Sequence, residues 1–298
     1  MEGSSKILDK KIPYGISNYK RLIQDNYLYV DKTRYIEKLE NLHAPYIFFL
    51  RPRRFGKSLF TSVLENYYDV NGKDDFEELF GNTYIGRNPT KEKSDYYVLK
   101  FNFSRLDTST GESLKRTFLE ATKKGFSNFI TNYNLIIEFN DEGFPATVFD
   151  SFLTQVEKKI NKPLYVIIDE YDHFANELLS FKTDIFSEIV SKTGFVRKWY
   201  EVLKIGTETI IKRIFATGVS PITLDSLTSG FNIGSDITRD VRFNEMMGFN
   251  EDEVRTLIAK CTKSSILEKD MDEIVHELRK NYNGYLFSED GRMRVFNS

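Results

Sequence analysis

An α/β fold with a mostly parallel sheet is the architecture that this 298-residue sequence predicts. Short and almost uninterrupted apolar runs alternate with segments whose apolar residues recur at helical spacing. A strand covered on both faces needs such a run, and alternating strands and helices are typical of parallel sheets. With 25 Phe and 17 Tyr, the chain can also bury a substantial core, which argues against disorder.

The apolar runs predict the strands of the sheet. The clearest are P-Y-I-F-F-L and L-Y-V-I-I, which are continuous and strand-length. The predicted strands are 45–50, 96–103, 164–168 and 213–218.

Helical spacing of apolar residues predicts the helices between these strands. Asp31 stands where a helix N-cap belongs, ahead of Tyr35, Ile36 and Leu39. The further predicted helices lie at 60–68, 148–160 and 195–203.

The pattern changes near residue 245, where the predicted strands end. Asn250 and Glu253 have the spacing of a capping box at the start of a helix. A second helix carries Ile274, Val275 and Leu278, and Asn-Gly at 283–284 ends it. We therefore expect a core with an N-terminal extension at 1–245 and a small helical lid at 246–298. No terminator is apparent at the last residues, so we expect the lid to continue beyond them.

Composition excludes several classes of function. The formal net charge is −2, so no overall positive field draws the chain to nucleic acid or anionic lipid. Cys261 is the only cysteine and the three histidines lie far apart, which argues against a disulfide and a Cys/His metal centre. No uncharged apolar run reaches 18 residues. We expect a cytoplasmic protein without a membrane partner.

The central motif is R-P-R-R-F-G-K-S at 51–58, between a predicted strand and a predicted helix. Gly56, Lys57 and Ser58 fit the phosphate-binding pattern G-x-x-x-x-G-K-[ST], whereas Arg51 replaces its first glycine. Backbone N–H groups near Gly56 would face phosphates, Lys57 would reach the β- and γ-phosphates, and Ser58 would ligate Mg²⁺. The residues expected to bind ATP are Arg53, Arg54, Phe55, Gly56, Lys57, Ser58 and Leu59.

Two features weaken this loop as a phosphate cradle. The missing glycine no longer relieves a tight turn, and Pro52 removes one N–H donor. The loop arginines could compensate, and we expect at least one of them to contact a phosphate. The alternative is solvated surface charge.

A second motif supports the first. The strand at 164–168 is followed by Asp169 and Glu170. Asp169 would bind Mg²⁺ through water, and Glu170 would be the general base for the attacking water. This pairing predicts a P-loop NTPase of the additional-strand type, in which a catalytic Glu follows the Mg²⁺-binding Asp. A strand-end carboxylate that caps a turn is the structural alternative.

The predicted strand at 213–218 is expected to lie between the two motif-bearing strands. Thr217 or Ser220 could hydrogen-bond the γ-phosphate or the attacking water, so we place Thr217 with Glu170 and Lys57 in the catalytic set. A turn set by Gly218 and Pro221 is an equal alternative. Farther along, Arg239 and Arg242 are arginine-finger candidates, although surface or ion-paired roles are favoured.

Several segments together resemble the bacterial AAA-ATPase-like family over nearly the whole chain. They are I-P-Y-G at 12–15, Y-V-D-K-T at 29–33, the 51–58 loop, I-D-E-Y-D at 168–172 and Y-N-G-Y at 282–285. In that family an arginine-rich loop without the first glycine looks usual. The resemblance implies a C-terminal PD-(D/E)XK nuclease-like domain, and through that domain DNA as a partner. The nuclease-like domain has no counterpart in this sequence. Residues 29–33 lie just before the first predicted helix, where related ATPases contact adenine. For this segment we favour a structural role, in which Asp31 caps the helix and Tyr29 and Val30 pack.

The motifs predict binding of ATP and Mg²⁺ and Mg²⁺-dependent ATP hydrolysis that drives or regulates a partner domain. A nucleotide-dependent switch with little turnover is the first alternative. A phosphotransferase is the second, and it is disfavoured because no acceptor-binding motif is apparent. Self-association stays open.

Overall fold

A five-stranded, wholly parallel sheet forms the centre of the molecule in a computed structural model, which describes residues 10–191, 193–220, 231–261, 268–288 and 293–297. The strand order is β2-β3-β4-β1-β5. The strands are β1 (Tyr46–Leu50), β2 (Tyr97–Asn102), β3 (Leu164–Asp169), β4 (Ile211–Gly218) and β5 (Ser235–Asp236). The four predicted strands are confirmed, and β4 lies between β1 and β3 as expected.

The register of the sheet brings four residues into one row near the carboxyl ends of the strands. Asn102 pairs with Asp169, Asp169 with Thr217, and Thr217 with Phe49. Paired residues of a parallel sheet lie on the same face, because side chains alternate along each strand. The register therefore places Asn102, Asp169 and Thr217 on one face, at the edge where ligands bind in open α/β sheets.

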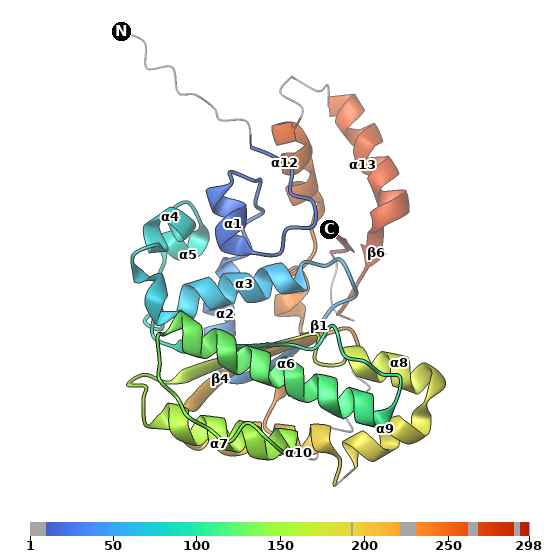
Figure 1. The fold of residues 1–298 in the computed structure, drawn as a ribbon. Helices are drawn as coiled ribbons and strands as arrows, with labels where there is room; N and C mark the ends of the chain where they lie inside the picture. The colour runs from blue at the N-terminus through green and yellow to red at the C-terminus, as the bar shows by residue number, and fades with distance from the viewer. Residues whose placement is uncertain (1–9, 192, 221–230, 262–267, 289–292, 298) are drawn as a thin grey trace.

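Helices cover both faces of the sheet (Figure 1). One face carries α6 (Gly111–Asn132), α7 (Pro145–Glu157) and α10 (Phe195–Gly206), with α8 (His173–Phe181) and α9 (Thr183–Val190) beside them. Trp199 is fully buried here among aromatic rings, as its helical spacing indicates. The other face carries α3 (Lys57–Tyr68), together with α2 (Arg34–Glu40), α4 (Phe76–Phe80) and α5 (Tyr84–Arg87).

The longest of these helices, α6, is absent from the sequence predictions. Its apolar residues Leu114, Phe118, Phe126 and Phe129 do recur at helical spacing, and Thr110 caps it by accepting a hydrogen bond from the Ser113 amide. The helix crosses β2 closely at Gly125, where a Cβ would lie 2.7 Å from the Phe101 ring. Lysines and small residues between the apolar positions weaken the pattern.

The N-terminal extension contains α1 (Tyr19–Gln24) and the segment before α2. Thr33, not Asp31, occupies the N-cap position of α2, so the predicted cap is wrong by two residues. Asp31 Oδ1 accepts hydrogen bonds from the Thr33 amide and hydroxyl, and its Oδ2 accepts one from the Tyr84 amide. Asp31 thus ties α2 to α5, a contact that sequence spacing does not reveal.

The C-terminal part begins with the predicted capping box. The Asn250 amide donates to Glu253 Oε2 and the Glu253 amide to Asn250 Oδ1, both at 2.9 Å. The two expected helices are α12 (Glu251–Cys261) and α13 (Glu268–Tyr282). An antiparallel pair follows that the sequence does not predict, β6 (Asn283–Tyr285) and β7 (Val295–Phe296). The division into core and lid at residue 245 stays a prediction.

The pair β6–β7 returns to the core rather than extending from it. Phe296 forms an isolated antiparallel bridge with Phe249, and Val295 is buried in the same apolar cluster as Phe49 and Met246. Figure 1 shows α12 and α13 side by side, with β6 at the end of α13. Within the described ranges, no helix is long and apolar enough to cross a membrane.

Candidate functional site: the phosphate loop and the ends of β3 and β4

The loop at 51–58 leaves the end of β1 and enters α3 at Lys57. Gly56 is the N-cap of α3 and has a φ of 80°, a left-handed conformation that favours glycine. Arg54 also has a positive φ, 65°. The start of α3 presents unpaired N–H groups and the positive end of the helix dipole, an arrangement suited to an anion.

Lys57 is 4% exposed, and its ammonium group points back into the loop. Nζ donates to the carbonyl oxygens of Arg51 and Pro52 at 3.0 and 3.1 Å. It also lies 3.5 Å from Glu170 Oε1, as an ion pair. The lysine of the loop and the glutamate after β3, 113 positions apart in the sequence, therefore meet at one point.

Asp169 ends β3 beside the start of α3. Burial raises the pKa of its carboxyl group, an effect that the neighbouring Ser58 side chain partly offsets. Oδ2 accepts a long hydrogen bond of 3.4 Å from the side-chain amide of Asn102, whereas the buried Oδ1 finds no hydrogen-bond partner among the described residues. An unsatisfied buried carboxylate oxygen next to a hydroxyl is the kind of group that a cation would complete.

Glu170 follows directly and has a φ of 56°, which is uncommon for a residue with a side chain. Conformations of this kind cost about 1–3 kcal/mol and cluster at functional sites. The turn is held because the Tyr171 amide donates to the Thr217 carbonyl and the His173 amide to that of Glu170. Because of this turn, the Glu170 side chain, unlike that of Asp169, is directed at Lys57.

Thr217 lies in the row beside Asp169 and is fully buried. Its hydroxyl donates to the Phe49 carbonyl at 2.8 Å. A contact with phosphate or water would require this hydroxyl to leave that carbonyl. The catalytic role of Thr217 stays a prediction.

Asp172 is a buried group that the sequence analysis leaves without a role. Its Oδ2 accepts hydrogen bonds from the amides of Val219, at 2.8 Å, and Ser220, just after β4. The Tyr171 hydroxyl donates to the Ser220 carbonyl at 2.9 Å. A Cβ at Gly218 would lie 2.3 Å from Asp172 Oδ1, so glycine is required there. The second aspartate of I-D-E-Y-D thus fixes the end of β4 relative to Glu170.

The three arginines of the loop separate into two groups. Arg53 and Arg54 are exposed. Arg51 is 1% exposed, and its guanidinium donates to backbone carbonyls, including those of Thr238 and Phe243. Arg51 is therefore not solvated charge, and the expectation that at least one loop arginine contacts phosphate stays a prediction for Arg53 and Arg54. Phe55 is buried and Leu59 half-buried, so both support the loop by packing.

Two other expectations concern residues outside this row. Arg242 is ion-paired with Asp240, which agrees with the favoured surface role rather than with an arginine finger.

Before α2, Lys32 Nζ lies 2.6 Å from Glu253 Oε2 of α12. Burial lowers the pKa of Lys32, against the raising effect of Glu253. The Tyr29 side chain is half-buried against an apolar cluster and its hydroxyl oxygen is buried, so packing accounts for the contacts of this segment.

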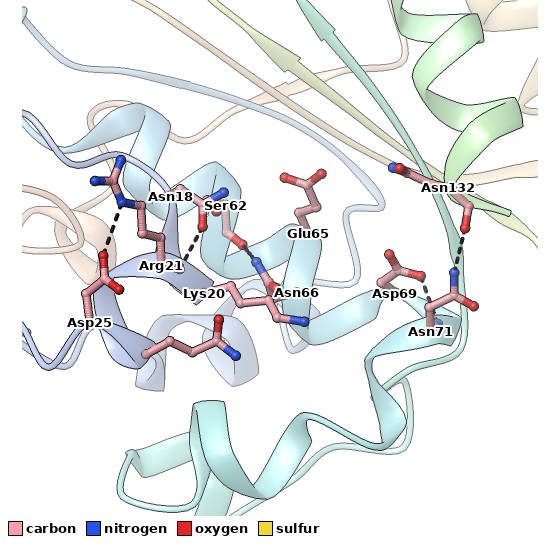
Figure 2. Close-up of a pocket in the computed structure, with 11 residues that line it drawn as sticks. Asn18, Lys20, Arg21, Asp25, Ser62, Glu65, Asn66, Asp69, Asn71 and Asn132 are labelled. Atoms are coloured by element: carbon pink, nitrogen blue, oxygen red, sulfur yellow. Dashed lines mark hydrogen bonds and ion pairs between the residues drawn. The ribbon is translucent and has the colours of Figure 1, made fainter.

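Two hollows of the described surface are lined by residues outside the 51–58 loop. One of about 570 Å³ is lined by polar residues of α1, α3 and the segments after them (Figure 2). Several of its side chains are engaged in polar contacts: Arg21 pairs with Asp25, the Asn66 side-chain amide donates to the Ser62 carbonyl, and that of Asn71 donates to the Asn132 carbonyl. A second, of about 670 Å³, runs along β2 and α6 and includes Asn102. Neither contains a residue predicted to bind nucleotide.

The carboxylates also limit the kind of metal site. Over the described residues, no group of three or more His, Cys, Asp or Glu could hold an ion. Mg²⁺ in nucleotide sites is bound by one or two protein groups together with phosphates and water. The unsatisfied Asp169 Oδ1 beside Ser58 fits that arrangement, and it fits no closed protein cage.

A family model described as a predicted AAA-ATPase matches residues 13–228, from the N-terminal extension to beyond β4. The chain belongs to this AAA-ATPase-like family. The matched range contains the 51–58 loop, Asp169, Glu170 and Thr217. Membership agrees with the wholly parallel sheet and with β4 between β1 and β3.

Two individual proteins are similar to this chain at low sequence identity. An uncharacterized protein in the vnfD 5′ region of Azotobacter chroococcum mcd 1 is 29% identical over 277 residues. That match covers 93% of this chain and 48% of the relative, so the chain spans about half the relative's length. AMPPCP-bound DnaA from Aquifex aeolicus is similar over 87% of this chain and 61% of its own, at 14% identity and a TM-score of 0.33.

Proposed function

We propose that this chain binds ATP with Mg²⁺ and hydrolyses it. The observation that carries the proposal is the meeting of Lys57, Asp169 and Glu170 at the carboxyl edge of the sheet, beside the start of α3. A cation, an unsatisfied carboxylate oxygen and a second carboxylate are the groups that phosphoryl transfer to water requires. They converge here from two distant motifs.

Phosphate binding is supported by the contacts of Lys57. Its ammonium group is held by carbonyl oxygens and by Glu170, all of which are acceptors that phosphate oxygens can replace. Because Lys57 is already buried at the helix start, little further ordering of its side chain is needed. The amides at the start of α3 would add donors to the same anion.

Mg²⁺ would be held by Ser58 and by Asp169, directly or through water. The bound ion would neutralise charge on the phosphate oxygens. Asp169 needs a cation more than a typical surface aspartate does, because burial disfavours its charged form. The Asn102 amide, which donates to Oδ2, would hold the carboxylate with Oδ1 free for this role.

In hydrolysis, the oxygen of a water molecule attacks the γ-phosphorus, the bond to the β-γ bridging oxygen breaks, and ADP and phosphate form. A carboxylate oxygen of Glu170 would take the proton that the water loses. Glu170 is paired with Lys57 before nucleotide binds, and phosphates that draw Lys57 away would release it. The same substrate that needs the base would therefore make it available.

The test is phosphate release in a single turnover, measured with and without Mg²⁺ alongside calorimetric ATP affinity. We expect binding in the presence of Mg²⁺ and release that stops when the ion is chelated. Absence of ATP binding to the folded chain would reject the proposal outright.

A switch with little turnover is the second candidate, and two contacts favour it. The Thr217 hydroxyl is bonded to the Phe49 carbonyl, and Glu170 is paired with Lys57. If both contacts persist in the complex, the γ-phosphate has neither a hydroxyl nor a free base beside it. Tight binding with no phosphate release in the same experiment would favour the switch over the ATPase.

The exposed arginines give a separate prediction. With Arg51 buried, Arg53 and Arg54 are the loop arginines left to reach phosphate. We expect Arg53→Ala or Arg54→Ala to weaken ATP binding roughly tenfold, about the loss of one charge-assisted hydrogen bond. Calorimetry over a dilution series separates two arrangements. A contact within the chain weakens binding at every concentration, whereas one that reaches a second copy lowers only hydrolysis, where the chain self-associates. Wild-type behaviour of both variants would leave them as solvated charges.

We also propose that nucleotide turnover drives or regulates a partner domain. The resemblance of the sequence to proteins with a nuclease-like domain supports this, as does a relative about twice as long as this chain. DNA would then be the object of that domain rather than of this one. Measuring ATP turnover with and without DNA, in a protein that contains this chain together with its partner domain, tests the idea.

A further inference from the structure

Arg51 stands where the phosphate-loop pattern has its first glycine, yet it is one of the largest fully buried side chains of the described structure. Its guanidinium donates to the carbonyls of Leu50, Thr238 and Phe243 at 2.8, 3.0 and 3.1 Å. A fourth, weaker contact of 3.4 Å reaches the Asn244 carbonyl.

The guanidinium is also stacked between two rings. Its central carbon lies 4.0 Å from the ring centre of Phe49 in β1 and 3.9 Å from that of Phe287, just after β6. A planar guanidinium suits this position, because it can stack and donate in its plane at the same time.

The backbone explains why glycine is dispensable at this position. Arg51 is not among the described residues with positive φ, whereas Arg54 and Gly56 are. The left-handed turns of the loop therefore fall after residue 51, and a side chain at 51 meets no backbone restriction. What the side chain contributes has to be sought in its contacts.

A buried charge is costly unless its surroundings compensate it, and the buried Nε of Arg51 finds no hydrogen-bond partner among the described residues. Burial lowers the pKa of Arg51 to about 9, with a raising effect from Asp236, and the group stays charged at neutral pH. Among the described residues no carboxylate lies within ion-pair distance of it. Carbonyl dipoles and ring faces thus compensate the charge, and they come mostly from the segment after β5.

The backbone of Arg51 joins the same residue to the site. Its amide donates to the Gly218 carbonyl at the end of β4, and its carbonyl accepts from Lys57 Nζ at 3.0 Å. Phe55 forms a second tether: its carbonyl accepts from the Gly248 amide, and its ring packs edge-on against those of Tyr285 and Phe287.

We propose that Arg51 is a positioning residue that fixes the phosphate loop to Thr238, Phe243 and Phe287, so that the loop's affinity for phosphate depends on these contacts. The effect on affinity rests on the proposed nucleotide binding. The loop would owe its shape to a buried tether, in place of the tight glycine turn of the usual pattern.

The expected effect follows from the fraction of time that the loop is correctly shaped. If loss of the tether leaves it competent about a tenth of the time, the apparent Kd rises about tenfold, although Arg51 contacts no phosphate. Arg51→Met keeps much of the apolar stem and removes the donors. Arg51→Lys keeps a charge but cannot stack and donate in several directions. Its affinity for Mg·ATP should therefore lie between those of Arg51→Met and wild type.

The experiment compares these variants with Arg213→Met, a matched control. Arg213 is a half-buried arginine that is ion-paired with Glu92, and it lies near the opposite end of β4 from the loop. For each folded variant we would measure the Kd for Mg·ATP and, without nucleotide, the amide hydrogen exchange of residues 53–57. Arg51→Met should raise both by about tenfold or more. Arg213→Met should lower the melting temperature and change neither.

Phe287→Leu is the second route if Arg51→Met does not fold, since it removes only the outer ring of the stack. It should raise Kd and loop exchange several-fold, and its effect should not add to that of Arg51→Lys, because both act on one tether. Wild-type Kd and loop exchange in folded Arg51 or Phe287 variants would overturn the inference. If wild type itself fails to bind ATP, the proposed function fails, and the exchange of 53–57 still decides the role of Arg51.

Discussion

Replacement of Glu170 by glutamine is expected to lower single-turnover phosphate release about 10²–10⁴-fold, the usual contribution of a general base. Glutamine keeps the size and hydrogen-bonding capacity of the side chain but cannot take the proton from water. ATP binding should not weaken, and should even tighten slightly. Lys57, which lies 3.5 Å from Glu170 Oε1, would no longer have to leave an ion pair to reach phosphate.

Glu120→Gln is a suitable control, because Glu120 is an exposed residue of α6 that is paired with Arg116. It removes one carboxylate that belongs neither to the 51–58 loop nor to the ends of β3 and β4, and its release rate should equal that of wild type. Phosphate release by Glu170→Gln at the wild-type rate would show that Glu170 is not the base. The carboxylate edge would then be reduced to a cation site at Asp169, and the switch hypothesis would gain support.

The parallel sheet could be predicted because burial on both faces leaves a local trace. β1 and β3 are continuous apolar runs in which nearly every residue is buried, and no contact with distant residues is needed to recognise them. The capping box at the start of α12 is local in the same sense, since Asn250 and Glu253 satisfy each other. The order of β1, β4 and β3 was predicted from the two motifs, because the strand at 213–218 is expected between the two strands that carry them.

The role of Arg51 could not be predicted, because its carbonyl acceptors at Thr238 and Phe243 lie 187 and 192 positions away in the sequence. Backbone carbonyls leave no residue-type signature, and an arginine in a basic loop resembles its exposed neighbours. The positions of Asp172 and Asn102 in the site are easier to predict from the sequence. One follows Glu170 within the same motif, and the other ends the strand that pairs with β3. Polar residues at the carboxyl ends of neighbouring strands were the available signal.

The groups of the candidate site are held in place by contacts within the chain itself. Lys57 is buried, Glu170 holds an uncommon backbone conformation, and Asp172 fixes the end of β4 through two amides. Preorganised groups of this kind lose little conformational freedom on binding. Lys57 is the one on which three acceptors converge, and its removal should have the largest effect on affinity.

Lys57→Ala is expected to weaken Mg·ATP binding by about 100-fold or more, since each charge-assisted hydrogen bond to phosphate contributes roughly 1.5–3 kcal/mol. The loss should exceed that of either exposed arginine, because the Lys57 ammonium is buried and less screened by solvent and salt. Calorimetry at fixed ionic strength measures it, with thermal unfolding to establish that the variant is folded.

Lys123→Ala supplies the control, because Lys123 is a partly exposed residue of α6 that is paired with Asp141, far from the loop in the sequence. Both variants lose one positive charge, so a general electrostatic effect on a polyanion would appear in both. A loss confined to Lys57→Ala would locate the phosphates at the start of α3. Equal affinity of wild type and folded Lys57→Ala would reject the 51–58 loop as the phosphate site, whatever the behaviour of Glu170.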